Sequence, residues 1–368
     1  MFTDYNEIDT PALLVEQKQM QNNLSKMQNI ADTAGVKLRP HTKTHKTPEL
    51  ARLQLEHGAS GIAVAKLSEA EVMAEYGFDD IQIANIIIGS QKMDRLIKLR
   101  QKIKNLSCNV DSIQAAQELS EKFKIAGGWI DVFIEINSGH NRNGLNNYND
   151  IYLLAKFIEQ SQGLNFVGIF THAGHVYSAK SHDEVKAIGE NEGQFLASIA
   201  EKLMNQRILV TKISVGSTPT AKYCSKINGV TEIRPGNYIF YDMIQTGLGS
   251  CTIDECALTV LATVISVSED RVIIDAGAKS LSLEKGIYGI KDLDSYGMII
   301  GKVNSKITRI SEEHGIIENP ADSFYVGEKI RIIPNHACTV VNLFDNIYLA
   351  DENKIITKYD IKGRGMSQ

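Results

Sequence analysis

Long apolar runs, a basic excess and a signal-like N-terminus are all absent from this sequence of 368 residues. No apolar run approaches the roughly eighteen residues that a membrane-spanning helix needs, and the first residues lack the basic-then-apolar pattern of a secretory signal. The 39 Lys and Arg residues against 44 Asp and Glu give a net charge of -5, which does not indicate a nucleic-acid partner. We therefore expect a soluble cytoplasmic protein that uses neither a membrane nor a nucleic acid.

Cysteine is also scarce, and its five positions are odd in number and widely spread. Such a set predicts reduced thiols and excludes a disulfide framework. No repeat, low-complexity tract or long linker stands out. The length itself predicts a large core divided between two domains.

Between about Gly35 and Gly236, strand-like and helix-like segments alternate. The strand-like segments are 36–39, 61–64, 81–84, 106–110, 132–136, 166–170, 209–215 and 232–234. The helix-like segments are 18–34, 68–76, 91–104, 112–123, 151–160 and 190–204. Eight such alternations predict a parallel (β/α)8 barrel of the TIM type, here over residues 17–246. A doubly wound open sheet is the alternative, because alternation alone does not show closure.

Beyond Gly247 the strand-like segments 258–266, 271–276, 298–303, 329–333 and 354–358 follow one another without long helices between them. This pattern predicts a separate, mostly-β domain over residues 247–368. The strand-like segment 12–16 precedes the first helix of the barrel and is a candidate to join that second domain.

The most informative segment is Arg39-Pro40-His41-Thr42-Lys43-Thr44-His45-Lys46, which follows the first predicted strand. No Asp or Glu lies between Arg39 and Glu49, so the segment concentrates positive charge. Clustered cations are useful where a lysine must lose its proton or an anion must bind. A basic surface loop is the other interpretation, but catalytic groups of a barrel lie where strands end, which favours Lys43 as an active-site lysine.

Two further loops have the composition of a phosphate site. Gly216-Ser217-Thr218-Pro219-Thr220 follows the seventh strand and Arg234-Pro235-Gly236-Asn237-Tyr238 follows the eighth. Small residues let backbone N–H groups approach an anion, and barrels commonly bind phosphate at this place. Each loop alone could be an ordinary turn. Together with Lys43 they predict a phosphorylated cofactor that forms a Schiff base, and pyridoxal phosphate is the natural candidate.

The segment Pro334-Asn335-His336-Ala337-Cys338 carries a possible metal pair. On a strand, residues two apart face the same side, so His336 and Cys338 would both point at one ion. Imidazole with thiolate favours zinc, and two protein ligands leave positions open, as a catalytic metal requires. A purely structural role of the two residues is the alternative.

These motifs together resemble the family of metal-dependent D-threonine aldolases and D-serine dehydratases, which are pyridoxal phosphate enzymes of the alanine racemase fold. The resemblance covers nearly the whole chain. Besides the segments above, it includes Asp9-Thr10-Pro11-Ala12, the 139–144 loop, 232–238, Asp275-Ala276-Gly277-Ala278-Lys279 and Ser311-Glu312-Glu313-His314-Gly315.

The resemblance implies that Lys43 forms the internal aldimine with the cofactor. It also implies that Arg142 approaches the phenolic oxygen of the cofactor and that Arg234 faces its pyridine nitrogen. Further cofactor contacts are expected at Tyr177, Ser217, Thr218, Gly236, Asn237 and Tyr238. His336 and Cys338 match the metal pair, with zinc expected and manganese as the alternative, and the family implies a homodimer.

The family performs two reactions on small β-hydroxy D-amino acids. In elimination, Lys43 removes the α-proton and the hydroxyl leaves as water, giving a keto acid and ammonia. In retro-aldol cleavage, a base removes the hydroxyl proton and the Cα–Cβ bond breaks, giving glycine and an aldehyde. Cys338 favours elimination, because a cysteine is typical of the zinc dehydratases and aldolases can carry an Asp instead. Candidates for the base are His45, His172 and His175, each of which could instead orient the cofactor or Lys43.

Two other classes of function stay open at this point. An amino-acid racemase needs a second proton carrier, often a partner's tyrosine, and would leave the metal pair unexplained. A non-catalytic pyridoxal phosphate carrier resembles the barrel alone, so the additional β-domain argues against it.

Overall fold

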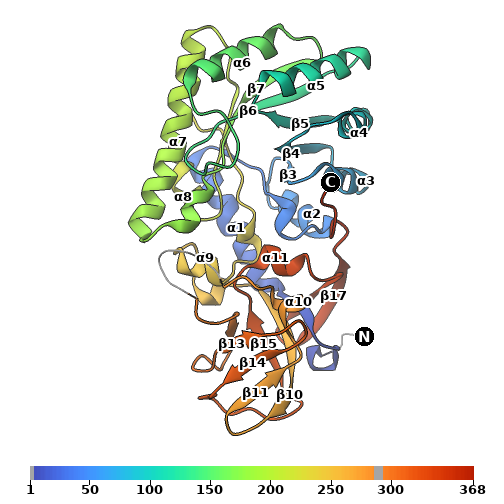
Figure 1. Cartoon of the computed structure of the whole chain (residues 1–368), viewed down its shortest axis with the longest axis vertical. Helices are drawn as coiled ribbons and strands as arrows, with labels where there is room; N and C mark the ends of the chain where they lie inside the picture. Colours follow the sequence, from blue (N-terminus) through green and yellow to red (C-terminus); the bar gives the residue numbers. More distant parts are fainter. Residues whose placement is uncertain (1–3, 286–292) are drawn as a thin grey trace.

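The computed structural model describes residues 4–285 and 293–368, and within them it forms two bodies stacked along the long axis. The upper body in Figure 1 is a barrel of eight parallel strands surrounded by helices, and the lower body is built on a nine-stranded sheet. This confirms the expected fold class. The structure does not test a domain boundary at residue 246, which stays a prediction.

The barrel strands follow the order β2-β9-β8-β7-β6-β5-β4-β3. Their bounds are β2 (Lys37–Leu38), β3 (Ile62–Val64), β4 (Asp80–Ile86), β5 (Asn105–Val110), β6 (Ile130–Glu135), β7 (Leu164–Phe170), β8 (Lys212–Val215) and β9 (Glu232–Ile233). Between β2 and β3 the backbone N–H of Ala63 donates to the Pro40 carbonyl at 2.8 Å, and Ser60 N–H donates to Leu38 at 2.9 Å. A parallel bridge between His41 and Ala63 lies beside these bonds. These contacts close the ring, so the sheet is a barrel and not the open alternative.

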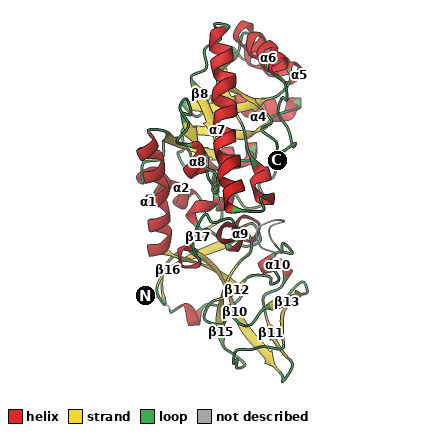
Figure 2. Ribbon diagram, turned by 90° about the vertical axis from the view of Figure 1, so that its left-hand side faces the viewer, coloured by secondary structure: helices red, strands yellow, loops and turns green. Residues whose placement is uncertain are grey.

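The helices pack around the outside of this ring. Their bounds are α1 (Gln17–Ala34), α2 (Pro48–Glu56), α3 (Leu67–Glu75), α4 (Ser90–Arg100), α5 (Ile113–Ile125), α6 (Tyr148–Gln160) and α7 (His182–Asn205), with the short α8 (Ala221–Cys224) and α9 (Met243–Gly247). Helix α1 shows why these segments form helices that pack on the barrel. Its apolar residues recur at helical spacing and are all buried: Met20, Leu24, Met27 and Ala31. It ends at Gly35, whose φ of 69° suits a left-handed C-cap. Figure 2 shows α7 running along the outside of the barrel strands.

The second sheet follows the order β13-β14-β11-β10-β1-β16-β17, while β15 pairs with β10 and β12. The bounds are β1 (Ala12–Glu16), β10 (Leu258–Val267), β11 (Arg271–Ile274), β12 (Met298–Ile299), β13 (Ile307–Ile310), β14 (Gly315–Glu318), β15 (Lys329–Ile333), β16 (Asn346–Asp351) and β17 (Lys354–Asp360). The N-terminal β1 lies inside this sheet, antiparallel to β10 and parallel to β16. It therefore ties the start of the chain to the second body.

Some elements differ from the sequence-based expectations. Strands β13, β14 and β16 were not expected. The first two are short, and their exposed or half-buried positions weaken the alternation of apolar and polar residues by which a strand is predicted. The expectation that His336 and Cys338 lie on a strand is wrong. Strand β15 ends at Ile333, and His336 is instead the N-cap of the helix α11 (Ala337–Val341). In the part of the chain that the structure describes, no helix is long and apolar enough to span a bilayer.

Candidate active site

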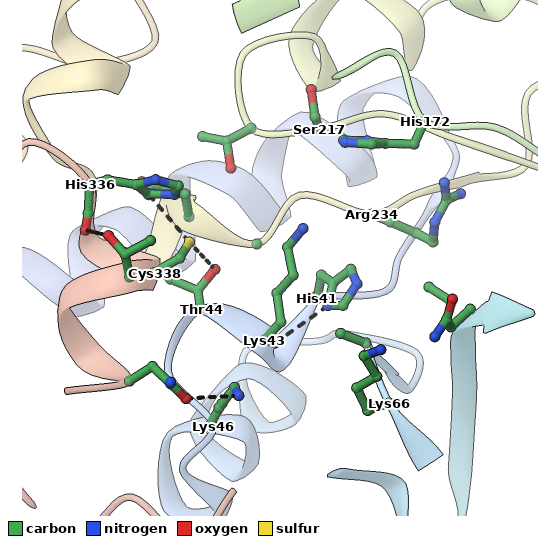
Figure 3. A pocket seen from close by; sticks show the side chains of 18 of the residues that line it. His41, Lys43, Thr44, Lys46, Lys66, His172, Ser217, Arg234, His336 and Cys338 are labelled. Atoms are coloured by element: carbon green, nitrogen blue, oxygen red, sulfur yellow. Dashed lines mark hydrogen bonds between the residues drawn. The ribbon is translucent and has the colours of Figure 1, made fainter. Parts of the chain in front are cut away.

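A cavity of about 890 Å³ opens where the barrel strands end and the β-domain begins. Its wall is formed by loops after β2, β3, β7, β8 and β9 on one side and by α11 on the other. The carboxyl ends of barrel strands are where this architecture places its chemistry. Figure 3 shows Lys43 projecting into the space between His336 and Cys338 on one side and Arg234 and Lys66 on the other.

Lys43 lies in the 3-10 turn η2 (Thr42–Thr44), directly after the first barrel strand. The His41 ring caps this turn by accepting the Lys43 backbone N–H at 3.4 Å, and the Thr42 hydroxyl donates to the Ala63 carbonyl at 3.2 Å. Burial lowers the pKa of the His41 imidazole well below its ordinary value, and the Lys43 ammonium lowers it further. A neutral imidazole therefore lies beside the lysine.

The loops after β8 and β9 form a cradle of free backbone donors. Gly216, Ser217, Thr218, Gly236 and Asn237 all line the cavity. Among the described residues, the backbone N–H groups of Thr218, Gly236 and Asn237 have no acceptor. A Cβ on Gly236 would lie 2.8 Å from the His41 carbonyl oxygen, so only glycine fits there. Backbone amides that line one cavity and have no protein acceptor suit an anion such as a phosphate.

Arg234 is held rigidly at the base of the cavity. Its guanidinium donates to the Ser214 hydroxyl at 2.5 Å and to the Thr171 carbonyl, and it lies 3.8 Å over the Phe170 ring. Burial lowers the pKa of Arg234 to about 10, against the opposing effect of the Glu232 carboxylate. The side chain thus keeps its charge at neutral pH.

Three other expected residues also line this cavity. Arg142 is half exposed, and its guanidinium is 3.8 Å from the Glu135 carboxylate. The Tyr177 hydroxyl accepts the Gln245 side-chain amide at 3.3 Å. Burial, together with the Lys43 and Arg142 cations, lowers the pKa of His172 well below its usual value.

The possible metal pair lies at the start of α11 and is joined to the Lys43 turn. The Cys338 thiol is 3.2 Å from the Thr44 hydroxyl, which belongs to the residue next to Lys43. The Nδ1 atom of His336 contacts the Glu284 carboxylate at 2.8 Å, and the same ring also interacts with the Cys338 thiol. Burial raises the pKa of the Cys338 thiol, but the His336 ring, the Lys43 ammonium and the Thr44 hydroxyl together bring this pKa below its ordinary value.

This donor set fits a divalent ion with open positions. A carboxylate behind a ligating histidine is a common supporting group, because it fixes the tautomer and the ring orientation. No cluster of three or more His, Cys, Asp or Glu ligands occurs in residues 4–285 and 293–368. The described chain thus offers two ligands here.

Three expected site residues do not line this cavity: His45, His175 and Tyr238. His45 is fully buried beneath the Lys43 turn, where its Nε2 atom contacts Gln54 at 3.2 Å and its Nδ1 atom accepts the Thr47 N–H at 3.1 Å. Both ring nitrogens are thus occupied, which argues against His45 as the base. His175 lines a different cavity of about 560 Å³, beside Asn137 and α7.

Tyr238 is also turned away from the main cavity. Its hydroxyl accepts the Gln54 amide at 3.1 Å, whereas its backbone N–H donates to the Thr218 hydroxyl at the same distance. The tyrosine ring is therefore part of the core, and only the backbone supports the anion cradle.

Sequence reasoning missed several residues of the cavity. His41 and Thr44 lie on either side of Lys43 in the same basic segment. The position of this segment, directly after a predicted strand, could have indicated that they line the site. Lys66 follows the second barrel strand, another position where a site residue is expected. Glu284 carries no signal in the sequence, because only the fold brings it to His336.

Comparison with known proteins gives matches over both bodies. The family description "Alanine racemase, N-terminal domain" matches residues 15–243, and "Putative serine dehydratase domain" matches residues 257–350. The D-threo-3-hydroxyaspartate dehydratase of Delftia sp. is 35% identical, over 90% of this chain and 91% of that protein. The D-serine dehydratase of Dictyostelium discoideum is 32% identical over 97% of both chains. The D-threonine aldolase of Arthrobacter sp. is also 32% identical, over 98% of this chain and 94% of its own.

Solved structures give the same picture. The Delftia dehydratase superposes with a TM-score of 0.92 at 32% identity, covering 97% of this chain and 98% of its own. Its other solved forms include a histidine-to-alanine mutant and a cysteine-to-alanine mutant in the metal-free form. The two substituted positions are two residues apart, as His336 and Cys338 are. An alanine racemase of Clostridium difficile shares the fold, with a TM-score of 0.71 at 15% identity over 96% of this chain and all of its own.

Proposed function

This chain belongs to the pyridoxal phosphate-dependent family of D-serine dehydratases, D-threonine aldolases and 3-hydroxy-D-aspartate lyases. We propose that it is itself a metal-dependent lyase of β-hydroxy D-amino acids. Within this class we propose elimination, giving a keto acid and ammonia. The contact of 3.2 Å between the Thr44 hydroxyl and the Cys338 thiol carries the proposal, because it brings the metal pair to the lysine turn.

The residues around the cavity support a bound pyridoxal phosphate. The free amides of Thr218, Gly236 and Asn237 suit its phosphate, and Lys43 suits its aldehyde carbon. When bound, the cofactor supplies an electron-withdrawing ring that stabilises negative charge at the substrate's Cα. Arg234 stays charged at neutral pH, so in the role we propose for it this side chain would keep the ring nitrogen facing it unprotonated.

Lys43 is the proton carrier in our proposal. Its Nζ atom, freed when the substrate amine takes its place, removes the proton from Cα. The neutral His41 ring caps the turn that holds Lys43 and therefore fixes its direction. His172, also neutral and lining the same cavity, is the remaining candidate of the three histidines for a second base.

The metal pair acts on the other end of the reacting bond. His336 and Cys338 would hold a divalent ion, and we propose zinc because a thiolate and an imidazole are its preferred ligands. The ion, when bound, withdraws electron density from the substrate's β-hydroxyl oxygen. The Cα–H and Cβ–O bonds then break, water leaves, and the unsaturated amino acid hydrolyses to the keto acid and ammonia. The homodimer implied by the family stays part of the proposal.

A product assay on D-serine and D-threonine tests this function. We expect pyruvate or 2-oxobutyrate together with ammonia, and no consumption of the L-enantiomers. Acetaldehyde with glycine from D-threonine would establish the aldolase reaction instead. Equal consumption of both enantiomers would contradict either lyase reaction.

A further inference from the structure

The cations that line the main cavity differ in what neutralises them. The Lys46 ammonium pairs with Glu69 at 3.2 Å and donates to the Asn342 side chain at 3.0 Å. Arg234 is held by Ser214 and Thr171, as described above. Lys43 is committed to the chemistry. Lys66 is the remaining lysine of the cavity, and no hydrogen bond or ion pair involves its ammonium among the described residues.

The position of Lys66 makes this unpaired charge unfavourable without an anion. Lys66 is the N-cap of α3, and its side chain makes no capping bond. A cation at this end of a helix is opposed by the helix dipole, and the usual N-cap residues are Ser, Thr, Asp and Asn. Departures from such local rules are expected at functional sites.

The surroundings of Lys66 leave room for a small anion. Ala65 and Ala84 line the same part of the cavity with methyl groups only. Asn85, at the end of the neighbouring strand β4, also lines it, and its side-chain amide has no hydrogen-bond partner in the described chain. An ammonium and an amide N–H group together match the two oxygens of a carboxylate.

We propose that Lys66, assisted by Asn85, binds the α-carboxylate of the substrate. The inference rests on the proposed function, since the substrate is an amino acid. In Figure 3 Lys43 lies between the metal pair and Lys66. A substrate whose amine lies near Lys43 would then have its β-hydroxyl on the side of His336 and Cys338 and its carboxylate on the side of Lys66.

This arrangement gives a physical reason for selecting one enantiomer. Amine, hydroxyl-bearing carbon and carboxylate are three of the four groups on Cα, and each has its own fixed place. The fourth group, the α-proton, then faces Lys43 in only one of the two configurations. Loss of the Lys66 contact should therefore weaken both the binding of the carboxylate and the discrimination between enantiomers.

Two small probes separate this role from any other. D-alanine has the amine and the carboxylate but no hydroxyl, whereas 2-aminoethanol has the amine and the hydroxyl but no carboxylate. Their dissociation constants are measured on the holoenzyme, by the change in cofactor absorbance and by calorimetry. The variants are Lys66→Met, Lys66→Arg as the charge-preserving rescue, and Lys98→Ala as a control at an exposed lysine of α4.

For Lys66→Met we expect D-alanine to bind about 10- to 100-fold more weakly, the range for one lost charge-assisted hydrogen bond. Binding of 2-aminoethanol should stay within about 2-fold, a shift too small to mark a lost hydrogen bond. Lys66→Arg should recover most of the loss, and Lys98→Ala should behave as the unmodified protein.

An equal weakening of both probes would overturn the inference, because Lys66 would then serve the cofactor or the fold. So would unchanged D-alanine binding in Lys66→Met, or no saturable D-alanine binding in the unmodified protein. Failure of the proposed function is seen separately, as an absence of product from β-hydroxy D-amino acids in the unmodified enzyme.

Discussion

The barrel half and the β-domain half of the cavity are built in different ways. The barrel half places its residues at the ends of buried parallel strands, where the register of the sheet fixes Lys43, Ser217 and Arg234 relative to one another. The β-domain half places its metal pair at the start of a short helix, α11, whose first turn carries Cys338 with His336 as its cap, and Glu284 supports it from a separate segment. A strand register tolerates little local variation, whereas a helix start can be re-oriented by a few contacts. The difference implies that binding of the cofactor and binding of the metal are separable properties.

The largest effect should come from the barrel half. Lys43→Ala removes the proposed proton carrier and the covalent attachment point together, so turnover should fall at least about 10³-fold, within the range of a positioned acid–base group. Borohydride should trap cofactor on the unmodified protein at Lys43, as peptide mapping would show, and should trap none on the variant. Lys279→Ala, at an exposed lysine paired with Glu313, is the matched control and should keep full activity. An adduct mapped to Lys66 or Lys279 would refute the assignment.

Loss of either metal ligand should remove metal binding at the β-domain half and leave cofactor binding at the barrel half intact. We expect His336→Ala and Cys338→Ala each to lower turnover by about 10² to 10³, a few kcal/mol of lost charge stabilisation in the reaction. The visible absorbance of the cofactor should stay largely intact, because its contacts lie on the barrel. Elemental analysis should find metal in the unmodified protein and little in the variants. Activity that survives in a metal-free variant would revive the racemase hypothesis.

Acid should act on the barrel half through the buried His45. Burial lowers the pKa of this imidazole from 6.5 to about 4, against a smaller opposing effect of the Gln54 contact. Between these two values the unfolded chain binds the proton and the folded protein does not, so stability is full above pH 6.5 and declines as the pH falls toward 4. The loss contributed by this residue is about 3 kcal/mol. Denaturant unfolding at several pH values should show a shallower decline for His45→Gln, and an unchanged decline would contradict a buried neutral His45.

Glu284 tests the support of the metal pair. Glu284→Gln keeps the size of the side chain but removes the charge that faces His336 Nδ1, and metal affinity should fall about 10- to 100-fold. Competition with a fluorescent zinc chelator measures this directly. Affinity for the cofactor should not change, and Glu313→Gln at the exposed pair with Lys279 should leave both affinities as they were. A parallel loss of cofactor would show that the two halves are not separable.

The smallest effect is expected at the contact between the halves. Thr44→Val removes the hydroxyl that meets the Cys338 thiol but keeps the shape of the turn. Loss of one hydrogen bond of ordinary strength should lower turnover by about two- to ten-fold. Steady-state kinetics with metal and cofactor both saturating would measure it, and a loss as large as that of Lys43→Ala would mean that Thr44 has a chemical role of its own.

The contrast between the barrel half and the β-domain half also explains which features the sequence could predict. In the barrel, alternation of strand-like and helix-like segments is nearly unbroken, so the eight strands and the loop positions of Lys43 and Arg234 followed from the pattern. Closure of the sheet did not, because it depends on the long-range contacts between β2 and β3. The metal segment looked like the continuation of the apolar strand 329–333, but His336 caps a helix there because Asp242 accepts the Ala337 N–H at 2.8 Å. That contact joins residues 95 positions apart and leaves no local trace. The sequence did not indicate that the side chains of His45 and Tyr238 have their partners outside this cavity, since nearness in sequence to Lys43 and Gly236 does not fix the direction of a side chain.

The central claim is that one cavity joins a cofactor half and a metal half and that elimination needs both. A single sample of holoenzyme, assayed with D-serine while a chelator removes its metal, tests this most directly. We expect formation of pyruvate and ammonia to stop, the visible absorbance of the cofactor to persist, and zinc to restore the activity. Pyruvate formation that continues at full rate in thoroughly metal-free protein would contradict the account.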